Sequence, residues 1–436
     1  MSVLKGRLRK LCLFACNLSS MRNSPFWILF IAGMILLDFY VFQVLKLVSA
    51  TAGNRTKSIL YAIYWGISIL ALLTLIILPL ITFDNLPKGL RSTVFAMVMA
   101  LFFAKVVAAV FFLIDDIRRG FQWVAGKVFF SGTEGEEVGG TEGISRSVFL
   151  SWLGIAAGTT LLGSLVYGFS NKYAYRIKRV PVQFSNLPTS FKGLKVVQLS
   201  DIHSGSLTDK AAVQCGVQQV LELKPDLILF TGDLVNNTAD EMDTLKEVFS
   251  ALKAPMGVYS VLGNHDYGDY VQWPTPAEKT ANLERLKGVH AAMGWRLLMN
   301  EHTVFERGED KIALLGIENW GAKARFPKYG KMPDAYAGTE GIPFKILMSH
   351  DPSHWDAEVL PKYKDIDLTL SGHTHGMQFG VEIPWLKWSP VQYVYKQWAG
   401  LYEHNGQKLY VNRGFGFLGY PGRVGILPEI TLFEFA

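Results

Sequence analysis

Residues 194–205 read LKVVQLSDIHSG, in which a short run of apolar and β-branched residues ends in Asp201 and His203. A run of about six such residues, bounded by turn-forming residues, is typical of a buried β-strand. A carboxylate and an imidazole directly after a buried strand are expected at the edge of a sheet, where side chains from several strands can meet. The sequence therefore predicts a site at the carboxyl end of this strand.

Similar runs follow along the chain as far as residue 436. The predicted strands are residues 195–200, 227–231, 258–262, 312–317, 346–349, 368–371, 409–412 and 430–435. The predicted helices are residues 208–223, 239–252 and 276–293. Because strands and amphipathic segments alternate, residues 195–436 are predicted to form one α/β domain.

Further polar residues stand directly after these predicted strands. They are Asp233, then Asn264, His265 and Asp266, then His350, and finally His373 and His375. Glycines beside them, such as Gly232 and Gly372, permit tight turns that let the side chains converge. Carboxylate and amide oxygens mixed with imidazoles, without a thiolate, suit Mn, Fe or Zn in a reactive site better than a structural zinc site.

This set of ligands is large enough for two metal ions. An aspartate set between two ions can bridge them at ~3.5–4 Å, and a hydroxide shared by both ions is a nucleophile at neutral pH. The paired charges also stabilise an in-line displacement at phosphorus. His265 is then placed to protonate the leaving oxygen, with Asp266 orienting its ring and raising its pKa. The pattern indicates a metal-dependent hydrolase of phosphoester or pyrophosphate bonds.

The first part of the chain is far more apolar than the rest, and 50% of all 436 residues are hydrophobic. Four apolar stretches approach the ~20 residues that a helix needs to cross a bilayer. They are residues 25–47, 58–82, 92–114 and 148–169. The predicted organisation is a basic tail at 1–24, an all-α region of four transmembrane helices at 25–170, a basic linker at 171–194 and the α/β domain at 195–436. The chain is expected to be an integral, multi-pass membrane protein.

The net charge of +6 is divided unevenly along the chain. Residues 1–194 carry 20 Lys and Arg against 8 Asp and Glu, whereas residues 195–436 carry 23 against 29. A domain that binds nucleic acid is expected to be basic, so this balance argues against a nucleic-acid partner. Lys and Arg near the helix ends number eleven on the side of the termini and seven on the opposite side. That bias predicts a cytoplasmic catalytic domain.

Five blocks of the polar set occur in a fixed order. They are Asp201-Ile-His203, Gly232-Asp233, Gly263-Asn264-His265-Asp266, His350 and Gly372-His373-Thr374-His375. Together they resemble the signature of the calcineurin-like metallophosphoesterases over about residues 195–436. The resemblance implies a two-sheet β-sandwich flanked by helices, with His265 as the catalytic histidine. It also implies a first metal ion on Asp201, His203, Asp233 and His375, and a second on Asp233, Asn264, His350 and His373.

Two other segments narrow this resemblance. The basic stretch before residue 194 and the run YVNRGFGFLGYPGR at 410–423 look like the membrane-tethered branch of the family. That branch includes transmembrane metallophosphoesterases and lipid-processing members such as UDP-2,3-diacylglucosamine pyrophosphohydrolases, several of which have fewer than four transmembrane helices. The resemblance implies a phosphorylated, lipid-linked or membrane-associated substrate. The alternatives are a soluble nucleotide or phosphoprotein substrate, and a non-catalytic membrane receptor; no protein partner is evident.

Asp38 and Lys105 are charged residues inside the first and third predicted membrane helices. Each lies some twelve or thirteen residues from the start of its helix. At a rise of ~1.5 Å per residue, both reach about the same depth, so they are expected to pair. The pair either fixes the packing of the helices or belongs to a path for lipid or protons.

Three further features each have two interpretations. Arg413 and Arg325 can each clamp a phosphate with two hydrogen bonds, or they can be surface or structural arginines. His354, four residues after His350, is expected to lie outside the metal set, which is complete without it. The segment 377–400 carries Trp385, Trp388, Tyr393, Tyr395 and Trp398. Such rings gather at the head groups of a bilayer, where they can admit a lipid, or they pack on the sandwich itself.

Overall fold

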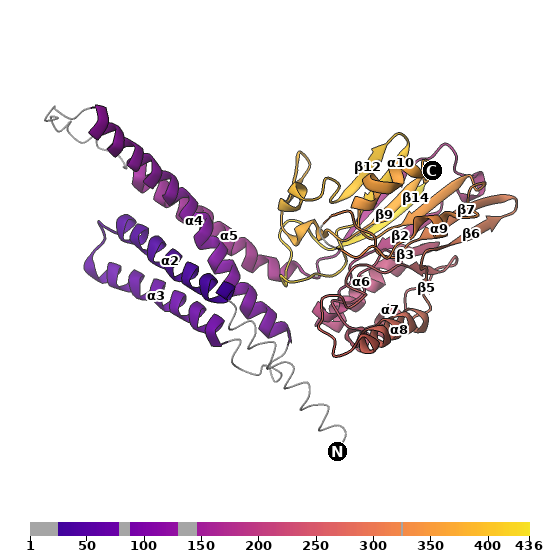
Figure 1. The fold of residues 1–436 in the computed structure, drawn as a ribbon, viewed down its shortest axis with the longest axis horizontal. Helices are drawn as coiled ribbons and strands as arrows, with labels where there is room; N and C mark the ends of the chain where they lie inside the picture. Colours follow the sequence, from indigo (N-terminus) through magenta and orange to yellow (C-terminus); the bar gives the residue numbers. More distant parts are fainter. Residues whose placement is uncertain (1–24, 78–87, 130–145, 324–325) are drawn as a thin grey trace, which may run out of the picture. The chain divides into compact units, whose positions relative to one another are not determined.

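The computed structural model describes residues 25–77, 88–129, 146–323 and 326–436, and the chain divides into two compact units, Met1–Val166 and Tyr167–Ala436. Figure 1 shows long helices in the first unit and β-sheets flanked by helices in the second. The predicted fold class, an all-α membrane region followed by an α/β domain with two sheets, is confirmed.

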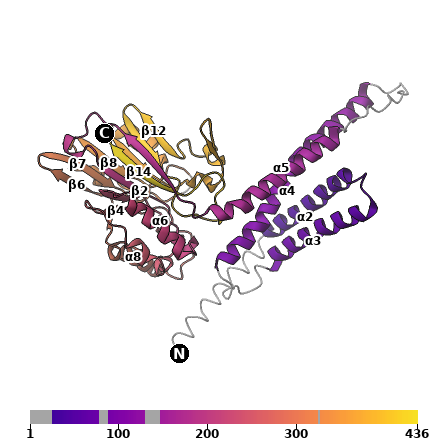
Figure 2. The same ribbon diagram turned by 180° about the vertical axis from the view of Figure 1, so that it is seen from behind.

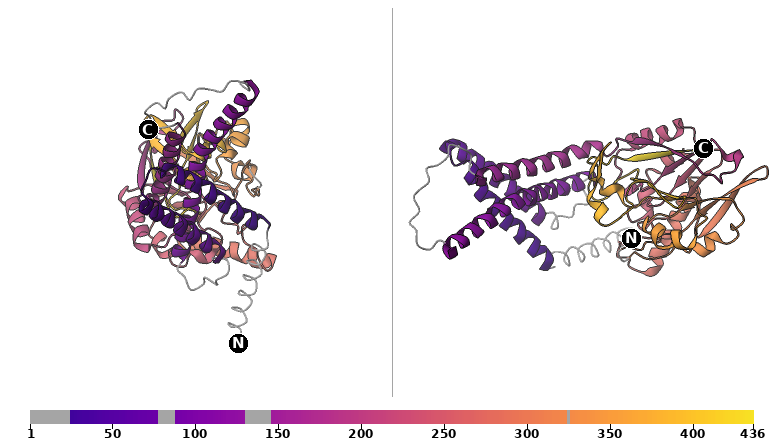
Figure 3. Two further views of the ribbon diagram at one scale, coloured as in Figure 1. Left: turned by 90° about the vertical axis from the view of Figure 1, so that its left-hand side faces the viewer. Right: turned by 90° about the horizontal axis from the view of Figure 1, so that it is seen from above.

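Within the described residues, four helices are long and apolar enough to cross a membrane. They are α2 (Pro25–Val48), α3 (Asn54–Ile77), α4 (Lys88–Phe129) and α5 (Arg146–Gly168), seen from two further directions in Figure 3. The prediction for the third helix is too short, because α4 continues from residue 114 to Phe129. Charged residues end the apolar run there, but Asp115 pairs with Arg118 at 2.8 Å and with Arg119 at 3.2 Å one turn later. Pairs at this spacing stabilise a helix.

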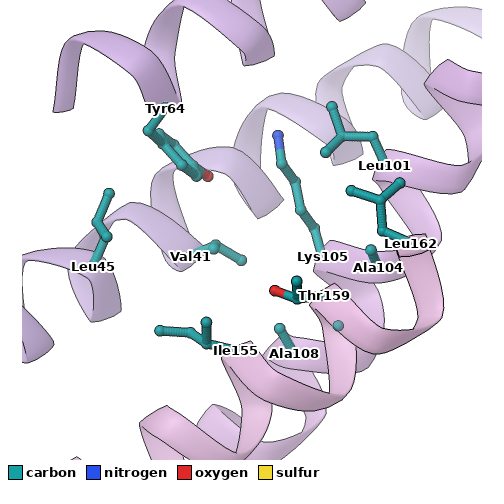
Figure 4. A pocket seen from close by; sticks show the side chains of 11 residues that line it. Val41, Leu45, Tyr64, Leu101, Ala104, Lys105, Ala108, Ile155, Thr159 and Leu162 are labelled. Carbon is teal, nitrogen blue, oxygen red and sulfur yellow. The ribbon is translucent and has the colours of Figure 1, made fainter. Parts of the chain in front are cut away.

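Asp38 on α2 and Lys105 on α4 form the predicted ion pair. Lys105 also donates to the Ser68 hydroxyl on α3 at 2.8 Å, and Asp38 is only 2% exposed. Tyr64 donates to the backbone carbonyl of Asp38 at 2.7 Å. Figure 4 shows Lys105 and Tyr64 at a cavity of about 220 Å³ that residues from all four helices line. The pair therefore joins three helices of the unit.

We expect Lys105→Met to lower the thermal stability of the detergent-solubilised chain, because the carboxylate of Asp38 would stay buried without its cation. Breaking a buried pair costs about 3–5 kcal/mol, whereas replacing both partners with apolar groups is often neutral. The double variant Asp38→Leu/Lys105→Met should therefore recover most of the loss. Arg119→Met is the control, because Arg119 is 59% exposed and its buried partner Asp115 keeps a second ion pair with Arg118. A melting midpoint of Lys105→Met no lower than that of Arg119→Met would contradict the prediction.

The described residues of the second unit form two six-stranded sheets, ordered β1-β14-β2-β3-β4-β5 and β12-β13-β9-β8-β7-β6. The strands of the first sheet are β1 (Arg176–Val182), β2 (Lys195–Leu199), β3 (Leu227–Phe230), β4 (Val258–Ser260), β5 (Arg296–Leu297) and β14 (Glu429–Phe435). Those of the second are β6 (Glu301–Arg307), β7 (Asp310–Gly316), β8 (Phe344–Met348), β9 (Leu368–Ser371), β12 (Gly400–His404) and β13 (Gln407–Val411). A separate hairpin pairs β10 (Val381–Ile383) with β11 (Leu386–Trp388).

The two sheets face each other across an apolar core. Val196 and Leu229 of the first sheet and Leu314 and Ile346 of the second are buried in one cluster. The outer face of the first sheet is covered by α6 (Lys210–Glu222), α7 (Lys246–Phe249) and α8 (Pro276–Ala292), as Figure 2 shows for α6 and α8. The shorter α9 (Met332–Tyr336), the π-helix η6 (Trp355–Val359) and α10 (Leu360–Lys362) contribute side chains that pack against the second sheet. The result is the sandwich that the resemblance implied.

All eight predicted strands are present with ends shifted by no more than two residues. The predicted helix at 239–252 is wrong as a single helix, because the chain forms a 3-10 turn, η5 (Ala239–Met242), and then the short α7. The buried residues of this segment include Ala239, Met242, Leu245, Phe249 and Leu252. One face of the segment therefore packs on the core, although the backbone changes from a 3-10 turn to an α-helix between Met242 and Lys246.

The interpretation of 171–194 as a linker is also corrected, because β1 lies inside it and pairs in parallel with β14 from Arg176 to Val182. The sequence does not predict the strands β1, β5, β6 and β12, which are the edges of the two sheets in the described chain. Edge strands are commonly polar and charged, and Pro181 in β1 is the kind of residue that an edge tolerates. They lack the apolar run that identifies a central strand.

Candidate metal centre

The predicted site residues stand at the carboxyl ends of parallel strands in both sheets. Asp201 follows β2, Asp233 follows β3 and Asn264 follows β4, and these three strands are parallel neighbours. His350 and His373 follow β8 and β9, which are parallel neighbours in the second sheet. Backbone hydrogen bonds join the loops, for example from the Asp201 N–H to the Gly232 carbonyl at 2.9 Å. Loops from the two sheets therefore present their polar side chains together.

Several of these residues hold the left-handed backbone conformation that non-glycine residues rarely adopt. They are Asp201 (φ 53°), His203 (φ 48°), Asp233 (φ 62°), His373 (φ 70°) and His375 (φ 50°). Each such residue costs on the order of 1–3 kcal/mol unless its surroundings stabilise the conformation, and such strain concentrates at functional sites.

Two glycines leave room for the aspartates. A Cβ atom on Gly263 would lie 2.2 Å from Asp233 Oδ1, and one on Gly372 would lie 2.2 Å from Asp201 Oδ2. Any larger residue would collide with these carboxylates, so both positions require glycine because of the close approach.

Two groups of ligand-type atoms result. In the first, Asp201, His203 and His375 have atoms within 4.8 Å of one another. His375 Nε2 lies 3.3 Å from Asp201 Oδ1 and 3.0 Å from His203 Nε2. Burial lowers the pKa of His203 to about 3, and burial holds the pKa of His375 well below its usual value. Both imidazoles are therefore neutral, as metal ligands must be.

The second group contains Asp233, His350 and His373, with Asn264 beside it. His350 Nε2 lies 3.1 Å from Asp233 Oδ2, and His373 Nδ1 lies 2.8 Å from Asn264 Oδ1. Burial alone would lower the pKa of His350, but the Asp233 carboxylate outweighs it and the pKa rises to about 10. The carboxylate of Asp233 therefore favours positive charge at this position, as a site for a metal cation requires.

The donor set fits two divalent metal ions. Asp233 Oδ2 is shared by the groups, because it also lies 3.5 Å from His203 Nε2. Carboxylate, imidazole and amide donors without thiolate are the ligands of Mn, Fe and catalytic Zn sites. The structure thus brings together all seven predicted ligands.

His265 borders both groups and is partly exposed. Its backbone N–H donates to Asp233 Oδ1 at 2.9 Å, and its ring packs edge-on against His203 with centroids 5.0 Å apart. Its Nδ1 lies 2.7 Å from the Asn236 carbonyl oxygen. A carbonyl only accepts, so Nδ1 carries the proton and Nε2 is left for another partner.

The predicted role of Asp266 needs correction. Its carboxylate is fully buried and accepts from the backbone N–H groups of Asp233 (2.9 Å), Leu234 (2.8 Å), Val235 (3.2 Å) and Gly263 (2.8 Å). These donors occupy both of its oxygens, and the Asn236 carbonyl orients His265 instead. Asp266 holds the Asp233 loop in place.

The structure separates the remaining candidates. Arg413 is only 4% exposed and pairs with Glu429 and with Glu382, the latter at 2.7 Å, so the structural alternative replaces the predicted phosphate clamp. Arg325 lies outside the described residues. His354 is fully buried outside the metal set and contacts Ser349 Oγ at 3.0 Å.

Two residues beside the centre were not singled out as site residues from the sequence. Tyr395 lies with its hydroxyl 2.8 Å from His373 Nε2 and donates to Asp351 at 3.3 Å. This contact gives the Nε2 proton an acceptor and leaves Nδ1 facing Asn264. Arg423 is fully buried and donates to the carbonyls of Arg413 (2.7 Å) and His375 (3.3 Å), which ties the His375 turn to the run at 410–423. In the sequence, Tyr395 belongs to the aromatic segment 377–400, and Arg423 ends the run at 410–423.

Comparison with known families gives two matches on the chain. Residues 21–172 match a family described as a probable calcineurin-like phosphoesterase transmembrane domain, and residues 194–377 match the calcineurin-like phosphoesterases. The match to a "transmembrane protein with metallophosphoesterase domain" of Danio rerio is 35% identical and covers 61% of this chain and 59% of that protein. The chain thus matches about three fifths of the length of that relative.

Two bacterial relatives are matched over most of their length. The metallophosphoesterase YkuE of Bacillus subtilis is 30% identical, over 66% of this chain and 97% of that protein. The protein named UDP-2,3-diacylglucosamine pyrophosphatase LpxG of Chlamydia trachomatis is 27% identical, over 61% of this chain and 92% of that protein. The two family matches, at residues 21–172 and 194–377, together cover the membrane helices and most of the sandwich.

Proposed function

Because this membrane protein belongs to the calcineurin-like metallophosphoesterases, which are hydrolases, we propose that it cleaves a phosphoester or pyrophosphate bond in a lipid-linked substrate. The observation that carries the reaction is the pair of ligand groups that share Asp233. The lipid character of the substrate is supported by the membrane helices on the same chain and by the similarity to the diacylglucosamine pyrophosphatase.

We assign the ligands as the sequence resemblance implied. Asp201, His203, Asp233 and His375 would hold one ion, and Asp233, Asn264, His350 and His373 would hold the other. Two divalent ions bound there would lower the pKa of water to supply a nucleophile at neutral pH, and would offset the negative charge of the phosphoryl oxygens. Mn, Fe and Zn are all compatible with these donors.

His265 supplies the proton that the leaving oxygen needs. Its Nδ1 is held by the Asn236 carbonyl, so Nε2 is the nitrogen that reaches substrate. The bond from its N–H to Asp233 Oδ1 keeps the imidazole beside the shared ligand. A protonated imidazole can give its Nε2 proton to the alcohol or phosphate that departs.

The direct test is metal content and turnover of the purified full-length chain. We expect about two equivalents of Mn, Fe or Zn, and hydrolysis of bis-p-nitrophenyl phosphate after Mn²⁺ is added. A panel of phosphorylated lipids in detergent should then give higher kcat/KM than nucleotides or a phosphopeptide. Absence of both metal and turnover would overturn the enzymatic proposal, and a preference for nucleotides would overturn the lipid part alone.

Tyr395→Phe is expected to weaken metal binding by about 10–100-fold, the usual effect of losing a hydrogen bond to a metal-ligating histidine. The change removes the acceptor for His373 Nε2 and the bond to Asp351. Titration of the apo-protein with Mn²⁺ measures the affinity. Tyr336→Phe is the control, because the Tyr336 hydroxyl also donates to a carboxylate, that of Asp365 at 2.7 Å, in a partly exposed contact. Equal Mn²⁺ affinities in the two variants would show that the Tyr395 hydroxyl does not support metal binding.

We also propose that the catalytic unit is cytoplasmic, as the distribution of Lys and Arg near the helix ends favours. In a Cys12→Ser/Cys16→Ser variant, Cys215 is the remaining cysteine, and its side chain is exposed. A membrane-impermeant maleimide should label it only after intact cells are permeabilised. Thr51→Cys in a Cys215→Ser background is the opposite-face control, since residue 51 lies in the exposed turn between α2 and α3. Labelling of Cys215 in intact cells would reverse the assignment.

A further inference from the structure

The segment between the last metal motif and β12 carries an apolar surface that no described part of the chain covers. Its exposed side chains are those of Ile383, Trp385, Leu386, Tyr393 and Val394, and we refer to these five as the interfacial surface. Trp385 is 81% exposed at the turn of the β10–β11 hairpin, and Tyr393 is 78% exposed. Trp388 Nε1 lies 3.4 Å from the Tyr393 hydroxyl, which joins the hairpin to the short η8 (Pro390–Tyr393). Exposed patches of this kind mark contact surfaces.

Hydrogen bonds connect this hairpin to the end of a membrane helix. The candidate membrane span of α5 runs to Asn171, and Gly168 near its end accepts from the Arg423 N–H at 2.9 Å. The next residue, Val424, donates to the Gln378 carbonyl at 2.8 Å and accepts from the Gly380 N–H at 2.9 Å. Gly380 directly precedes β10. A short backbone ladder therefore holds the base of the hairpin close to the point where the chain leaves the membrane span.

Basic side chains lie beside the hairpin. A cavity of about 320 Å³ is lined by Arg176 and Lys178 of β1, by Glu382 of β10, and by Arg413 and Glu429. Glu429 and Glu382 neutralise Arg413, and Lys178 lies 3.3 Å from Glu382. Arg176 is exposed and forms no ion pair with the residues that the structure describes. Its charge, five residues beyond the span, is available for an anionic head group.

The interfacial surface is also close to the metal centre along the chain. Tyr395, two residues after Tyr393, contacts His373, and Trp398 is buried in the same segment. One side of this segment therefore borders the metal ligands while the other exposes aromatic and aliphatic side chains. Trp and Tyr are the residues that prefer the head-group level of a bilayer.

From these four observations we propose that the interfacial surface docks on an anionic lipid bilayer, with Arg176 contacting head-group phosphates, and so passes a lipid phosphate to the metal centre. The docking stands on geometry alone. The delivery of substrate rests on the proposed function. Because the membrane helices already hold the chain at a bilayer, docking needs little affinity of its own.

The test measures how deeply residue 385 lies in the bilayer when the full-length chain is reconstituted in lipid vesicles. In a background with all three cysteines changed to serine, Trp385→Cys carries a nitroxide spin label. Its relaxation by oxygen, which concentrates in lipid, is compared with relaxation by a water-soluble nickel chelate. Glu247→Cys on α7 is the control, because the Glu247 side chain is 84% exposed. We expect the ratio of relaxation by oxygen to relaxation by the nickel chelate to be several-fold higher at residue 385 than at residue 247.

The charge is tested with two lipid compositions. Phosphatidylglycerol added to phosphatidylcholine should raise the ratio at 385, and Arg176→Glu should cancel that increase. A ratio at 385 equal to that at 247 in both vesicles would overturn docking. A label shielded from both reagents would indicate a protein contact and overturn it as well, and equal ratios in both lipids would overturn the role of Arg176. None of these readouts requires turnover, so failure of the proposed function would not imitate failure of docking.

Discussion

Asp233→Ala is expected to remove metal and activity together, lowering kcat/KM by at least about 10³-fold. The change removes the carboxylate that both ligand groups share. The charge of the bound metal ions stabilises the transition state by several kcal/mol, and each 1.36 kcal/mol corresponds to a tenfold change in rate. Asp233 Oδ2 is 3.1 Å from His350 Nε2 and 3.5 Å from His203 Nε2, and the residue is 1% exposed. Elemental analysis of the purified variant and kinetics with bis-p-nitrophenyl phosphate measure the two effects.

Two controls separate loss of metal from loss of fold. Asp233→Asn keeps the volume and should also lose metal, because the charge is what both groups share. Asp243→Ala removes an aspartate whose pair with Arg285 is solvent-exposed, and it should keep full activity. If the Asp233→Ala protein still carries two equivalents of metal, Asp233 is not the shared ligand.

His265→Ala is expected to keep both metal ions and lose turnover by about 10²–10⁴-fold, the range for a general acid. The imidazole is partly exposed and lies outside both ligand groups, so its removal leaves the donors intact. The loss should be large for a substrate with an alkyl leaving group and much smaller for a p-nitrophenyl ester, because p-nitrophenolate departs without a proton. Rates on paired substrates measure this difference.

The matched control for His265 is His302→Ala. His302 donates through its ring to the Ala335 carbonyl at 3.1 Å, the same kind of contact that His265 makes with Asn236, but on the β6 edge of the second sheet. Its replacement should leave the ratio of the rates on the two substrates unchanged. An equal loss on both leaving groups after His265→Ala would argue that the residue positions substrate and does not donate the proton.

Features that depend on short-range patterns can be predicted from the amino-acid sequence. Apolar runs next to turn residues identify the central strands, and a polar residue directly after such a run lies at the carboxyl end of its strand. The seven candidate ligands, from Asp201 to His375, are therefore predicted by the sequence alone. The pairing of Asp38 with Lys105 was predictable for a similar reason, because the constant rise of a helix converts sequence position into depth.

Features that depend on partners distant in the sequence become visible in the folded chain. Edge strands such as β1 have no apolar run and are recognised only by pairing, here with β14 more than two hundred residues away. The roles of Asp266 and Arg413 could not be read from their neighbours, because their charges are taken by backbone N–H groups and by carboxylates that the fold brings to them. Local sequence specifies backbone conformation and burial. The role of a charged side chain depends instead on which group the fold places within hydrogen-bonding distance of it.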